Sequence, residues 1–293
     1  MTKKNETLKV NYRFLSVDDF AVLHQTLLQA YSDYFVPFQL SEAQFENHIA
    51  QNAVDLDLSV GAFTDDKMVA FTLNGFGMWN GKQTAYDAGT GVIPSYRSKG
   101  IGRQMFEFLM PKLKEIGIKQ ILLEVISHNE KAVGLYRKLG FEETRKLINC
   151  DRKKTHNFIS KAKNGIKIRE IKTLDWDLLK TFWDGNTSWQ QSAEAIERSL
   201  IKKIILGAYL NEECVGYGIV SPKKGFISQI AVDQNHRRKG IASSILAEME
   251  VKIGSDKQLC VSNVDSNLDD TIAFLQKAGF EETLSQFEMI KLL

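Results

Sequence analysis

The sequence predicts an α/β protein made of two similar domains in tandem, each with a mixed β-sheet flanked by helices. Two landmarks recur at nearly the same interval. The segment 91–102, which contains an Arg-x-Lys-Gly turn, returns 140 residues later as 231–242, and the segment 140–144 returns as 279–283 after 139 residues. Because a unit of this size can enclose its own core, the interval indicates a duplicated globular domain and not a short structural repeat.

The spacing of apolar residues supports this prediction, because it gives the same order of elements in both halves. In the first half we expect strands and helices at 8–16, 17–34, 41–52, 58–64, 68–77, 83–93, 100–117, 120–126 and 130–139. In the second half we expect the same order at 166–171, 176–183, 193–201, 204–210, 215–220 and 226–232. The polar segment 161–165 separates the halves, so we expect domains at 1–160 and 166–293.

Composition excludes several classes of protein. Of the 293 residues, 43% are apolar and 25% are charged, which is usual for a globular chain, and a net charge of +2 leaves no large basic surface for nucleic acid. The first residues lack a signal-peptide pattern and no apolar run reaches membrane-spanning length, so we expect a cytoplasmic protein without nucleic-acid or membrane partners. The three cysteines are far apart, so we expect no metal site and interpret them as small buried side chains.

Each Arg-x-Lys-Gly turn joins an apolar, strand-like segment to an amphipathic, helix-like one. The first amides of a helix are free to donate hydrogen bonds, and the helix dipole adds about 0.3–1 kcal/mol of attraction for an anion. Gly100 and Gly240 let the backbone approach a ligand closely. The pattern therefore favours a phosphorylated cofactor in both halves, and a tight strand-to-helix turn is the alternative.

These features resemble the GNAT superfamily of acyl-coenzyme A (acyl-CoA) acyltransferases. The resemblance includes the Arg-x-x-Gly-x-Gly/Ala loop, the apolar strand before it, and the string formed by Asn129, Ala132, Tyr136, Gly140 and Phe141. It covers nearly the whole chain as two tandem GNAT folds. It implies that acetyl-CoA, or another acyl-CoA, is the co-substrate, and that the acyl group passes by direct attack in a ternary complex to an amine of a small molecule or peptide.

The resemblance also implies which residues hold the cofactor. The entering strands would pair with the pantetheine arm, the amide of Val92 would face the thioester oxygen, and the loops would hold the pyrophosphate. In the first half these residues are Thr90, Gly91, Val92, Arg97, Ser98, Lys99, Gly100, Ile101, Gly102 and Asn129; in the second they are Ile230, Ala231, Val232, Arg237, Arg238, Lys239, Gly240, Ile241 and Ala242. Arg97 and Arg237 could instead be solvated surface cations.

Tyr136 stands where the family keeps a tyrosine that protonates the departing thiolate. Reference pKa values near 10 for tyrosine and 8.5 for a thiol make this transfer uphill by roughly 2 kcal/mol, which is small enough for catalysis. The alternative is a tyrosine that only packs on its helix. The equivalent position in the second half is Leu275, which has no proton to donate.

A general base is less clearly marked. Asp87, on the strand that enters the turn, and Glu124, on the next strand, are both candidates. Asp87 could instead have a structural role, bonded to Thr90 or to Tyr86. Its equivalent in the second half is Ile227.

We therefore expect the N-terminal domain to perform the chemistry while the C-terminal domain keeps only the cofactor motif. A non-catalytic acyl-CoA sensor, catalysis in the C-terminal domain with a regulatory N-terminal one, and a structural role are the alternatives. Neither the acceptor nor the oligomeric state follows from the sequence. Aromatic residues of the first half form either an acceptor pocket or packed core: Tyr31, Tyr34, Phe35, Phe38 and Phe45.

Overall fold

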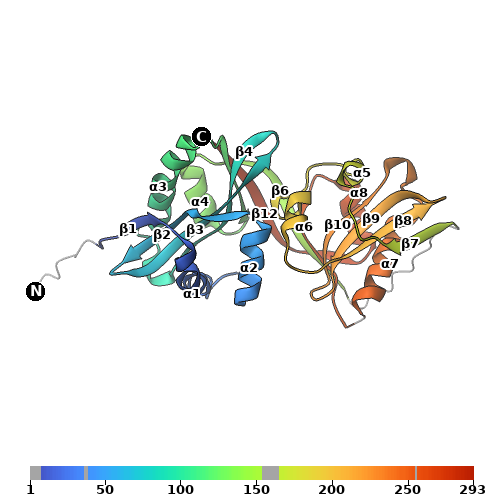
Figure 1. Cartoon of the computed structure of the whole chain (residues 1–293), viewed down its shortest axis with the longest axis horizontal. Helices are drawn as coiled ribbons and strands as arrows, with labels where there is room; N and C mark the ends of the chain where they lie inside the picture. Colours follow the sequence, from blue (N-terminus) through green and yellow to red (C-terminus); the bar gives the residue numbers. More distant parts are fainter. Residues whose placement is uncertain (1–7, 36–38, 154–164, 255) are drawn as a thin grey trace, which may run out of the picture. The chain divides into compact units, whose positions relative to one another are not determined.

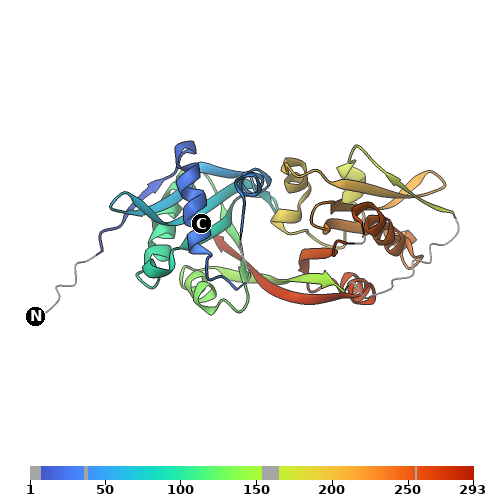
Figure 2. The ribbon, with the colours of Figure 1, turned by 90° about the horizontal axis from the view of Figure 1, so that it is seen from below.

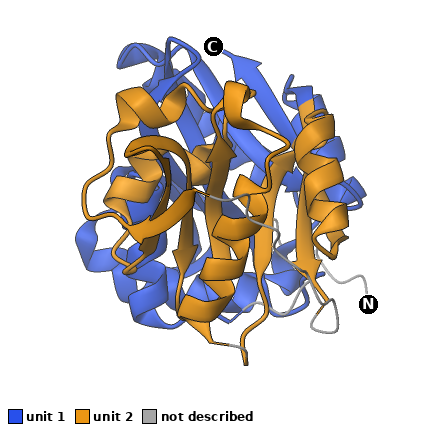
Figure 3. Cartoon of the chain, turned by 90° about the vertical axis from the view of Figure 1, so that its right-hand side faces the viewer, with its two compact units in different colours: residues 1–144, 288–293 blue, residues 145–287 orange. Residues whose placement is uncertain are grey.

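The computed structural model of the chain describes residues 8–35, 39–153, 165–254 and 256–293 and confirms a mixed α/β fold with helices on its sheets. The chain divides into two compact units, which Figure 3 colours separately. Unit 1 comprises residues 1–144 and 288–293, and unit 2 comprises residues 145–287. Most of the segment predicted to separate the domains lies outside the described residues.

Unit 1 has the predicted element order (Figure 1). Its strands follow the order β1-β2-β3-β4-β5, next to which lies the end of the C-terminal strand β12. The elements are β1 (Asn11–Phe14), η1 (Val17–Asp19), α1 (Phe20–Ala30), α2 (Glu42–Gln51), β2 (Val54–Thr64), β3 (Lys67–Trp79), β4 (Lys82–Val92), η2 (Pro94–Tyr96), α3 (Ile101–Glu115), β5 (Gln120–Ile126) and α4 (Glu130–Lys138).

Unit 2 repeats this order after one strand, β6 (Glu142–Arg152), that begins in unit 1. Its strand order is β12-β6-β11-β10-β9-β8-β7, with residues 280–287 of β12 in this unit. The elements are β7 (Ile166–Glu170), α5 (Trp176–Lys180), η3 (Trp189–Gln191), α6 (Ala193–Arg198), β8 (Ile204–Leu210), β9 (Glu213–Ser221), β10 (Phe226–Val232), η4 (Gln234–His236), α7 (Ile241–Ile253), β11 (Cys260–Asp265), α8 (Asp269–Lys277) and β12 (Phe280–Leu292).

Local chemistry explains the hairpins. The β2–β3 hairpin turns at Asp65 and Asp66, as predicted, with φ of 45° and 62°, a conformation that aspartate tolerates better than most residues. The corresponding turn of unit 2 uses Asn211 and Glu212, with φ of 47° and 67°. These two-residue turns fix the register of the strands that lead to each Arg-x-Lys-Gly turn.

Helices cover the sheet of unit 1 on both faces. Strand β3 is buried along most of its length, and both α1 and α3 contact it. Phe71 lies on the face of α1, because its ring is 6.4 Å from that of Tyr31. Since neighbouring side chains of a strand point to opposite faces, Thr72 points to the other one. There the buried stripe of α3 supplies Met105, Leu109 and Leu113, which are 0% exposed.

Two strands, β6 and β12, are each divided between the two units. Residues 288–293, which include the end of β12, belong to unit 1, where the amide of Leu293 donates to the carbonyl of Lys119 at 3.0 Å and Thr144 donates to the Glu288 carboxylate at 2.7 Å. Residues 145–152 of β6 belong to unit 2, where they pair with β11. Figure 2 shows β6 in green beside β12 in red. Each unit thus includes a strand segment from the half of the sequence that supplies most of the other unit.

Candidate functional site

The two Arg-x-Lys-Gly turns have the same backbone conformation. Ser98 and Gly100 have φ of 61° and 81°, and Arg238 and Gly240 have φ of 60° and 81°. Each glycine is the N-cap of the helix that begins at the next residue, α3 or α7, and the first amides of a helix have no partner within it. Free amides, a helix N-terminus and nearby cations together make an anion cradle. Binding of a cofactor pyrophosphate by these two cradles stays a prediction.

The second glycine of the first turn has a packing role. A Cβ atom at Gly102 would lie 3.2 Å from Leu135 of α4, so its absence lets α3 and α4 pack closely. Ala242 stands at the equivalent position of unit 2. Of the two glycines in the first turn, therefore, Gly100 is the one in a left-handed conformation, and Gly240 is its equivalent in unit 2.

The first arginine of each turn braces the strand before it. Arg97 Nε donates to the carbonyl of Val92 at 3.0 Å, while its terminal nitrogens bind Ala30 O and the Asp33 carboxylate. Arg237 repeats the pattern with Val232 O, Phe182 O and Asp184. Both guanidinium groups are thus tied to the segment after the first helix of their unit, and phosphate binding by them stays a prediction.

Both strands that enter the turns separate from their parallel neighbours at the same point. In unit 1 the parallel pairing of β4 with β5 runs from Thr84 to Asp87, and the register with β3 shifts beside Asp87. In unit 2 the pairing of β10 with β11 ends at Ile227, with a register shift between Ile227 and Gln229. A bulge redirects a strand and leaves its next backbone groups unpaired on one side. The residues predicted to pair with the pantetheine arm, Thr90–Val92 and Ile230–Val232, come just after these bulges in the sequence.

In unit 1 the two predicted catalytic residues meet at this separation. The Tyr136 hydroxyl donates to Asp87 Oδ2 at 3.3 Å, although the two residues come from α4 and β4. Asp87 also accepts from the hydroxyl of Thr90 at 2.8 Å and from the amide of Gly89 at 3.0 Å. The ring of Tyr136 packs edge-on against Phe106 and Phe141. The contact with Tyr136 therefore supports a role of Asp87 in proton transfer, and the contact with Thr90 supports a structural role.

Burial dominates the electrostatics of this pair. Desolvation raises the pKa of Asp87 to about 6, against the opposing effect of hydrogen bonds from Thr90, Gly89 and Tyr136. Desolvation and the neighbouring Asp87 charge raise the pKa of Tyr136 well above its usual value. Tyr136 therefore holds its proton at neutral pH, while Asp87 titrates close to neutrality.

Two further groups adjoin the separation of the strands. The second candidate base, Glu124 of β5, accepts a hydrogen bond from Tyr86 at 2.7 Å. The sequence analysis missed His48 of α2, whose Nε2 lies 2.8 Å from the carbonyl of Ala88 at the bulge. Burial lowers the pKa of His48, so its neutral ring donates to that carbonyl. A single histidine in a polar helix carries no sequence signal for this contact.

The structure divides the aromatic residues of the first half. Phe45 is 0% exposed and packs on Phe20, so it belongs to the core. Tyr31 reaches the site, because its hydroxyl donates to the carbonyl of Thr90 at 3.0 Å, and its ring packs edge-on against Tyr34. Phe35 is 54% exposed. Phe38 lies outside the described residues.

Asn129 and Lys99 have local contacts. The side chain of Asn129 caps α4 by accepting from the amide of Ala132 at 3.3 Å. The amine of Lys99 lies 5.1 Å from the centre of the Tyr96 ring. Cofactor contacts by these two residues stay predictions.

Unit 2 keeps the backbone of the site and changes its side chains. Leu275 and Ile227, which stand in the places of Tyr136 and Asp87, are each 3% exposed and belong to one apolar cluster. Beside the bulge, Tyr217 donates to Gln229 Oε1 at 2.6 Å and accepts from Trp183 Nε1 at 2.6 Å. The polar groups at this point of unit 2 are therefore an amide, a phenol and an indole.

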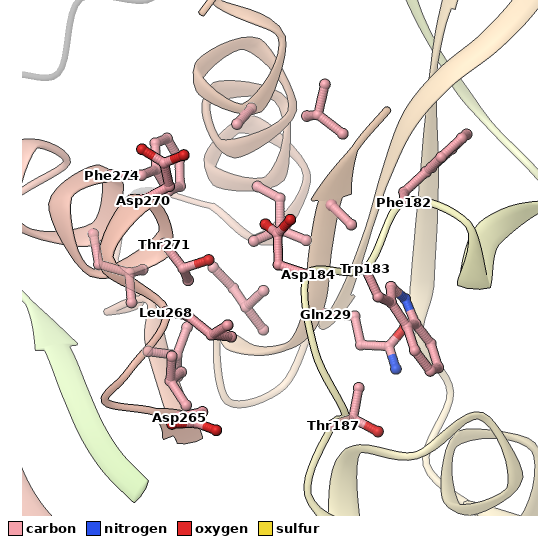
Figure 4. A pocket seen from close by; sticks show the side chains of 18 of the residues that line it. Phe182, Trp183, Asp184, Thr187, Gln229, Asp265, Leu268, Asp270, Thr271 and Phe274 are labelled. Carbon is pink, nitrogen blue, oxygen red and sulfur yellow. The ribbon is translucent and has the colours of Figure 1, made fainter. Parts of the chain in front are cut away.

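A cavity of about 470 Å³ lies within unit 2. Figure 4 shows Trp183, Gln229 and Thr187 on one side of it and Leu268, Thr271 and Phe274 on the other. Its wall includes Arg237, Arg238 and residues 240–242 of the turn, together with residues of the separated strands β10 and β11. The cavity thus connects the anion cradle with the bulge.

Two other expectations concern metal sites and membrane-spanning helices. In the described part of the chain there is no cluster of three or more His, Cys, Asp or Glu residues that could hold a metal ion. Nor is any helix among the described residues long and apolar enough to cross a membrane. Cys150 is buried as expected, whereas Cys214 and Cys260 are partly exposed.

Comparisons with known proteins agree with this geometry. The chain is 31% identical over 110 residues to a [ribosomal protein bS18]-alanine N-acetyltransferase of Salmonella typhimurium, which covers 36% of this chain and 66% of that protein. Among solved structures, a tandem GNAT protein from the clavulanic acid biosynthesis pathway has a TM-score of 0.74 at 13% identity, covering 97% of this chain and 98% of that one. An N-acetyltransferase from Sphaerobacter thermophilus has a TM-score of 0.70 at 14% identity, with 97% and 95% covered.

These similarities differ in what they establish. At 13% and 14% identity, the two solved structures establish the tandem fold alone. The chain spans about two thirds of the length of the curated relatives that it matches. The model of the acetyltransferase (GNAT) family, in contrast, matches residues 24–141 and 168–280, most of both units. The chain therefore belongs to the acetyltransferase (GNAT) family, with one family domain matched in each half of its sequence.

Proposed function

We propose that unit 1 transfers an acetyl group from acetyl-CoA to an amine of a small molecule or peptide. The observation that carries this proposal is the contact between Tyr136 and Asp87 at the point where β4 and β5 separate. Acetyl-CoA supplies the activated thioester. The cradle from Ser98 to Gly102 would hold its pyrophosphate, and the backbone of Thr90–Val92 would direct its pantetheine arm toward the bulge.

The pair can move one proton in each direction. As the acceptor nitrogen bonds to the acetyl carbon and the carbon–sulfur bond breaks, Tyr136 gives its proton to the sulfur. Asp87 takes the proton that the nitrogen loses, and passes it to the tyrosine oxygen along their hydrogen bond. Every proton lost by the amine is therefore gained by the thiol. The long contact of 3.3 Å leaves Tyr136 free to turn toward the sulfur.

Glu124 is the alternative acceptor of the amine proton. Its carboxylate is bonded to Tyr86, and its burial is incomplete. The two candidate bases differ in their relation to the proposed acid, because Asp87 contacts Tyr136 whereas Glu124 contacts Tyr86. Loss of Asp87 should therefore change both proton transfers, and loss of Glu124 only one.

A second function, acyl-CoA binding without turnover, is favoured for unit 2. The cradle there has the conformation of the first, with φ of 60° and 81° at Arg238 and Gly240. Leucine and isoleucine replace the acid and the candidate base, at Leu275 and Ile227. We propose that unit 2 binds its ligand and leaves it unchanged.

The proposed acid is tested by Tyr136→Phe, which keeps the ring packed on Phe106 and removes only the hydroxyl. We expect kcat to fall by about a hundredfold or more, the usual range for a general acid, with the Kd of acetyl-CoA unchanged. Stopped assays should follow free thiol and acetylated amine together, by mass spectrometry, across a panel of amines and peptides. Tyr209→Phe, a partly exposed tyrosine of unit 2, is the matched control. An unchanged kcat in Tyr136→Phe would remove the proposed acid.

The catalytic unit is identified by a pair of loop variants. Gly100→Val and Gly240→Val each place a branched side chain at a left-handed position that starts a helix, which costs about 1–3 kcal/mol in that conformation. Turnover should fall far more in Gly100→Val than in Gly240→Val. The reverse result would assign the chemistry to unit 2. Circular dichroism and melting curves show whether both variants are folded.

A further inference from the structure

The cavity of unit 2 extends beyond the residues needed to hold coenzyme A. Its wall continues past the bulge at Ser228 and Gln229 to the segment before η3, including Asn186, Thr187 and Ser188. A pantetheine arm laid along Ile230–Val232 would point its sulfur toward this end. The additional space therefore lies where an acyl group would be placed.

The side chains around the bulge at this end of the cavity are polar and neutral. The amide of Gln229 is held by two hydrogen bonds: its oxygen accepts from Tyr217 at 2.6 Å, and its nitrogen donates to the carbonyl of Gln191 at 2.6 Å. Trp183 donates to Tyr217 in turn. Burial raises the pKa of Tyr217 far above its usual value, so its hydroxyl stays neutral. The network fixes the orientation of Gln229 without placing a charge in the cavity.

Two buried oxygen atoms of the wall are left without a hydrogen-bond partner among the described residues. They are Ser188 Oγ and Gln191 Oε1. The two residues are 1% and 6% exposed, and both line the cavity. A buried polar atom without a partner costs free energy, about 1–3 kcal/mol, that a suitable ligand recovers. Gln191 Oε1 can only accept, and Ser188 Oγ can donate or accept, so together they fit a group that donates a hydrogen bond.

Two carboxylates of the wall, Asp184 and Asp265, already have a cation beside them. Asp184 accepts from Arg237, and Asp265 lies 3.3 Å from Arg145, which also binds the carbonyls of Asn186 and Thr187. These ion pairs hold the wall in place. The acyl end of a bound ligand would therefore be recognised by the neutral polar groups.

We propose that unit 2 binds an acyl-CoA whose short acyl chain ends in a neutral hydrogen-bond donor, such as a hydroxyl group. This inference rests on the proposed binding of acyl-CoA by unit 2, and it adds the identity of the acyl group. An ammonium group there would be desolvated beside an amide and two hydroxyls, and a carboxylate would lack a cation. A plain alkyl chain would leave Ser188 Oγ and Gln191 Oε1 without partners.

A series of matched thioesters tests the proposal by calorimetry on the full chain. Butyryl-CoA, 3-hydroxypropionyl-CoA and β-alanyl-CoA have the same number of heavy atoms in the acyl chain and differ in the last one, and succinyl-CoA adds a carboxylate. The experiment uses the Gly100→Val variant, in which only the anion cradle of unit 2 is left unchanged. We expect the hydroxyl compound to bind about tenfold more tightly than butyryl-CoA, because a site built for a hydroxyl group rejects an analogue that lacks it. β-Alanyl-CoA and succinyl-CoA should bind more weakly than butyryl-CoA.

Variants assign this preference to the wall. Gln191→Leu should abolish the preference for the hydroxyl compound while keeping the affinity for butyryl-CoA, and Ser188→Ala, a smaller change, should reduce it. Gln190→Leu, a neighbour on η3 outside the cavity wall, is the matched control and should keep the preference.

Three outcomes are decisive. Equal affinity for butyryl-CoA and 3-hydroxypropionyl-CoA would overturn the inference and leave acyl-CoA binding in place. Tightest binding of the amine or the carboxylate compound would overturn it in favour of a charged acyl group. Absence of any CoA binding in Gly100→Val would refute both the inference and the proposed role of unit 2, while turnover by the wild-type chain separately tests unit 1.

Discussion

At the scale of single residues, Asp87 has an environment that suits proton transfer and does not suit stability. The side chain is 6% exposed, and burial raises its pKa to about 6 although three donors surround it. The carboxylate form is therefore held by few but well-placed hydrogen bonds. A group with this pKa can accept a proton and release it again close to neutral pH.

The pH dependence of turnover should report this residue. Asp87 accepts a proton only when it is ionised, so kcat/KM should fall as the pH decreases below about 6. Thr90→Val removes a donor to the carboxylate, which raises its pKa further, and the fall should then begin at higher pH. The acceptor amine titrates identically in both enzymes, so the difference between their profiles isolates Asp87. Identical midpoints in the two profiles would contradict the role of Asp87 as base.

Asp87→Asn supplies the control for this experiment. It should remove the fall centred near pH 6 together with most of the activity. Because the folded pKa lies above the ordinary 3.8, ionisation of this carboxyl costs stability progressively as the pH rises from about 4, and the cost is complete above about 6. The asparagine variant should therefore melt at a higher temperature than the wild type at pH 7.5, and this advantage should disappear below pH 4.

Sequence patterns located part of the site. Tyr136 and Asp87 were singled out on separate segments, and the structure brings them into contact. The contacts of His48 and of Tyr31 with β4 join residues about 40 and 59 positions apart, which no local pattern encodes. The network of Gln229 depends likewise on the packing of three segments. Side chains with a chemical signature could be predicted, and side chains whose role comes only from tertiary contacts could not.

At the scale of elements, α4 positions the proposed acid. Asn129 caps its first turn, and the ring of Tyr136 packs against Phe106 of α3. Gly134 lies in the middle of this helix, where a Cβ atom would meet nothing within 4 Å. Strand β4 shows the opposite case, because a Cβ at Gly91 would lie 2.7 Å from the Phe71 ring and 2.9 Å from Ala30. Gly134 therefore has room for a side chain, whereas at Gly91 the close packing of β4 leaves no room for one.

Substituting each glycine by alanine should therefore change the free energy of unfolding in opposite directions. Gly134→Ala should raise the free energy of unfolding by about 0.5–1 kcal/mol, because glycine is a poor helix former. Gly91→Ala should lower it by about 1–3 kcal/mol, because α1 and Phe71 must move to accommodate the methyl group. Urea denaturation followed by circular dichroism measures both. If Gly91→Ala unfolds at the same urea concentration as the wild type, the contact between β4 and α1 is looser than described.

The elements themselves were largely predictable, and their irregularities were not. β5 begins and ends at the predicted residues, and the Asp65–Asp66 turn was identified from its composition. The bulge beside Asp87 was missed, since it inserts a residue without changing the apolar character of the strand. It is this bulge that separates β4 from β5 and creates the proposed binding edge.

At the scale of the whole molecule, duplication has preserved the backbone of the site and allowed its side chains to diverge. Both units keep the same left-handed positions and the same point of strand separation. Unit 1 places a tyrosine and an aspartate there, whereas unit 2 places leucine and isoleucine beside a neutral amide network. The repeat in the sequence predicted two units. It did not indicate that each unit includes a strand segment from the other half, because equivalent strands of two repeats have similar apolar patterns.

The shared strands make the end of the chain part of unit 1. Met289 is 0% exposed and Leu292 is 63% exposed, so they form a matched pair on one strand. Met289→Ala should destabilise unit 1 by about 2–5 kcal/mol, whereas Leu292→Ala should have little effect. Deletion of residues 288–293 removes all the contacts of this segment with unit 1 and should abolish turnover. Hydrogen exchange measured by mass spectrometry should show lost protection in α3 of unit 1 while α7 of unit 2 stays protected. Loss confined to α7 would show that the last strand stabilises unit 2 instead.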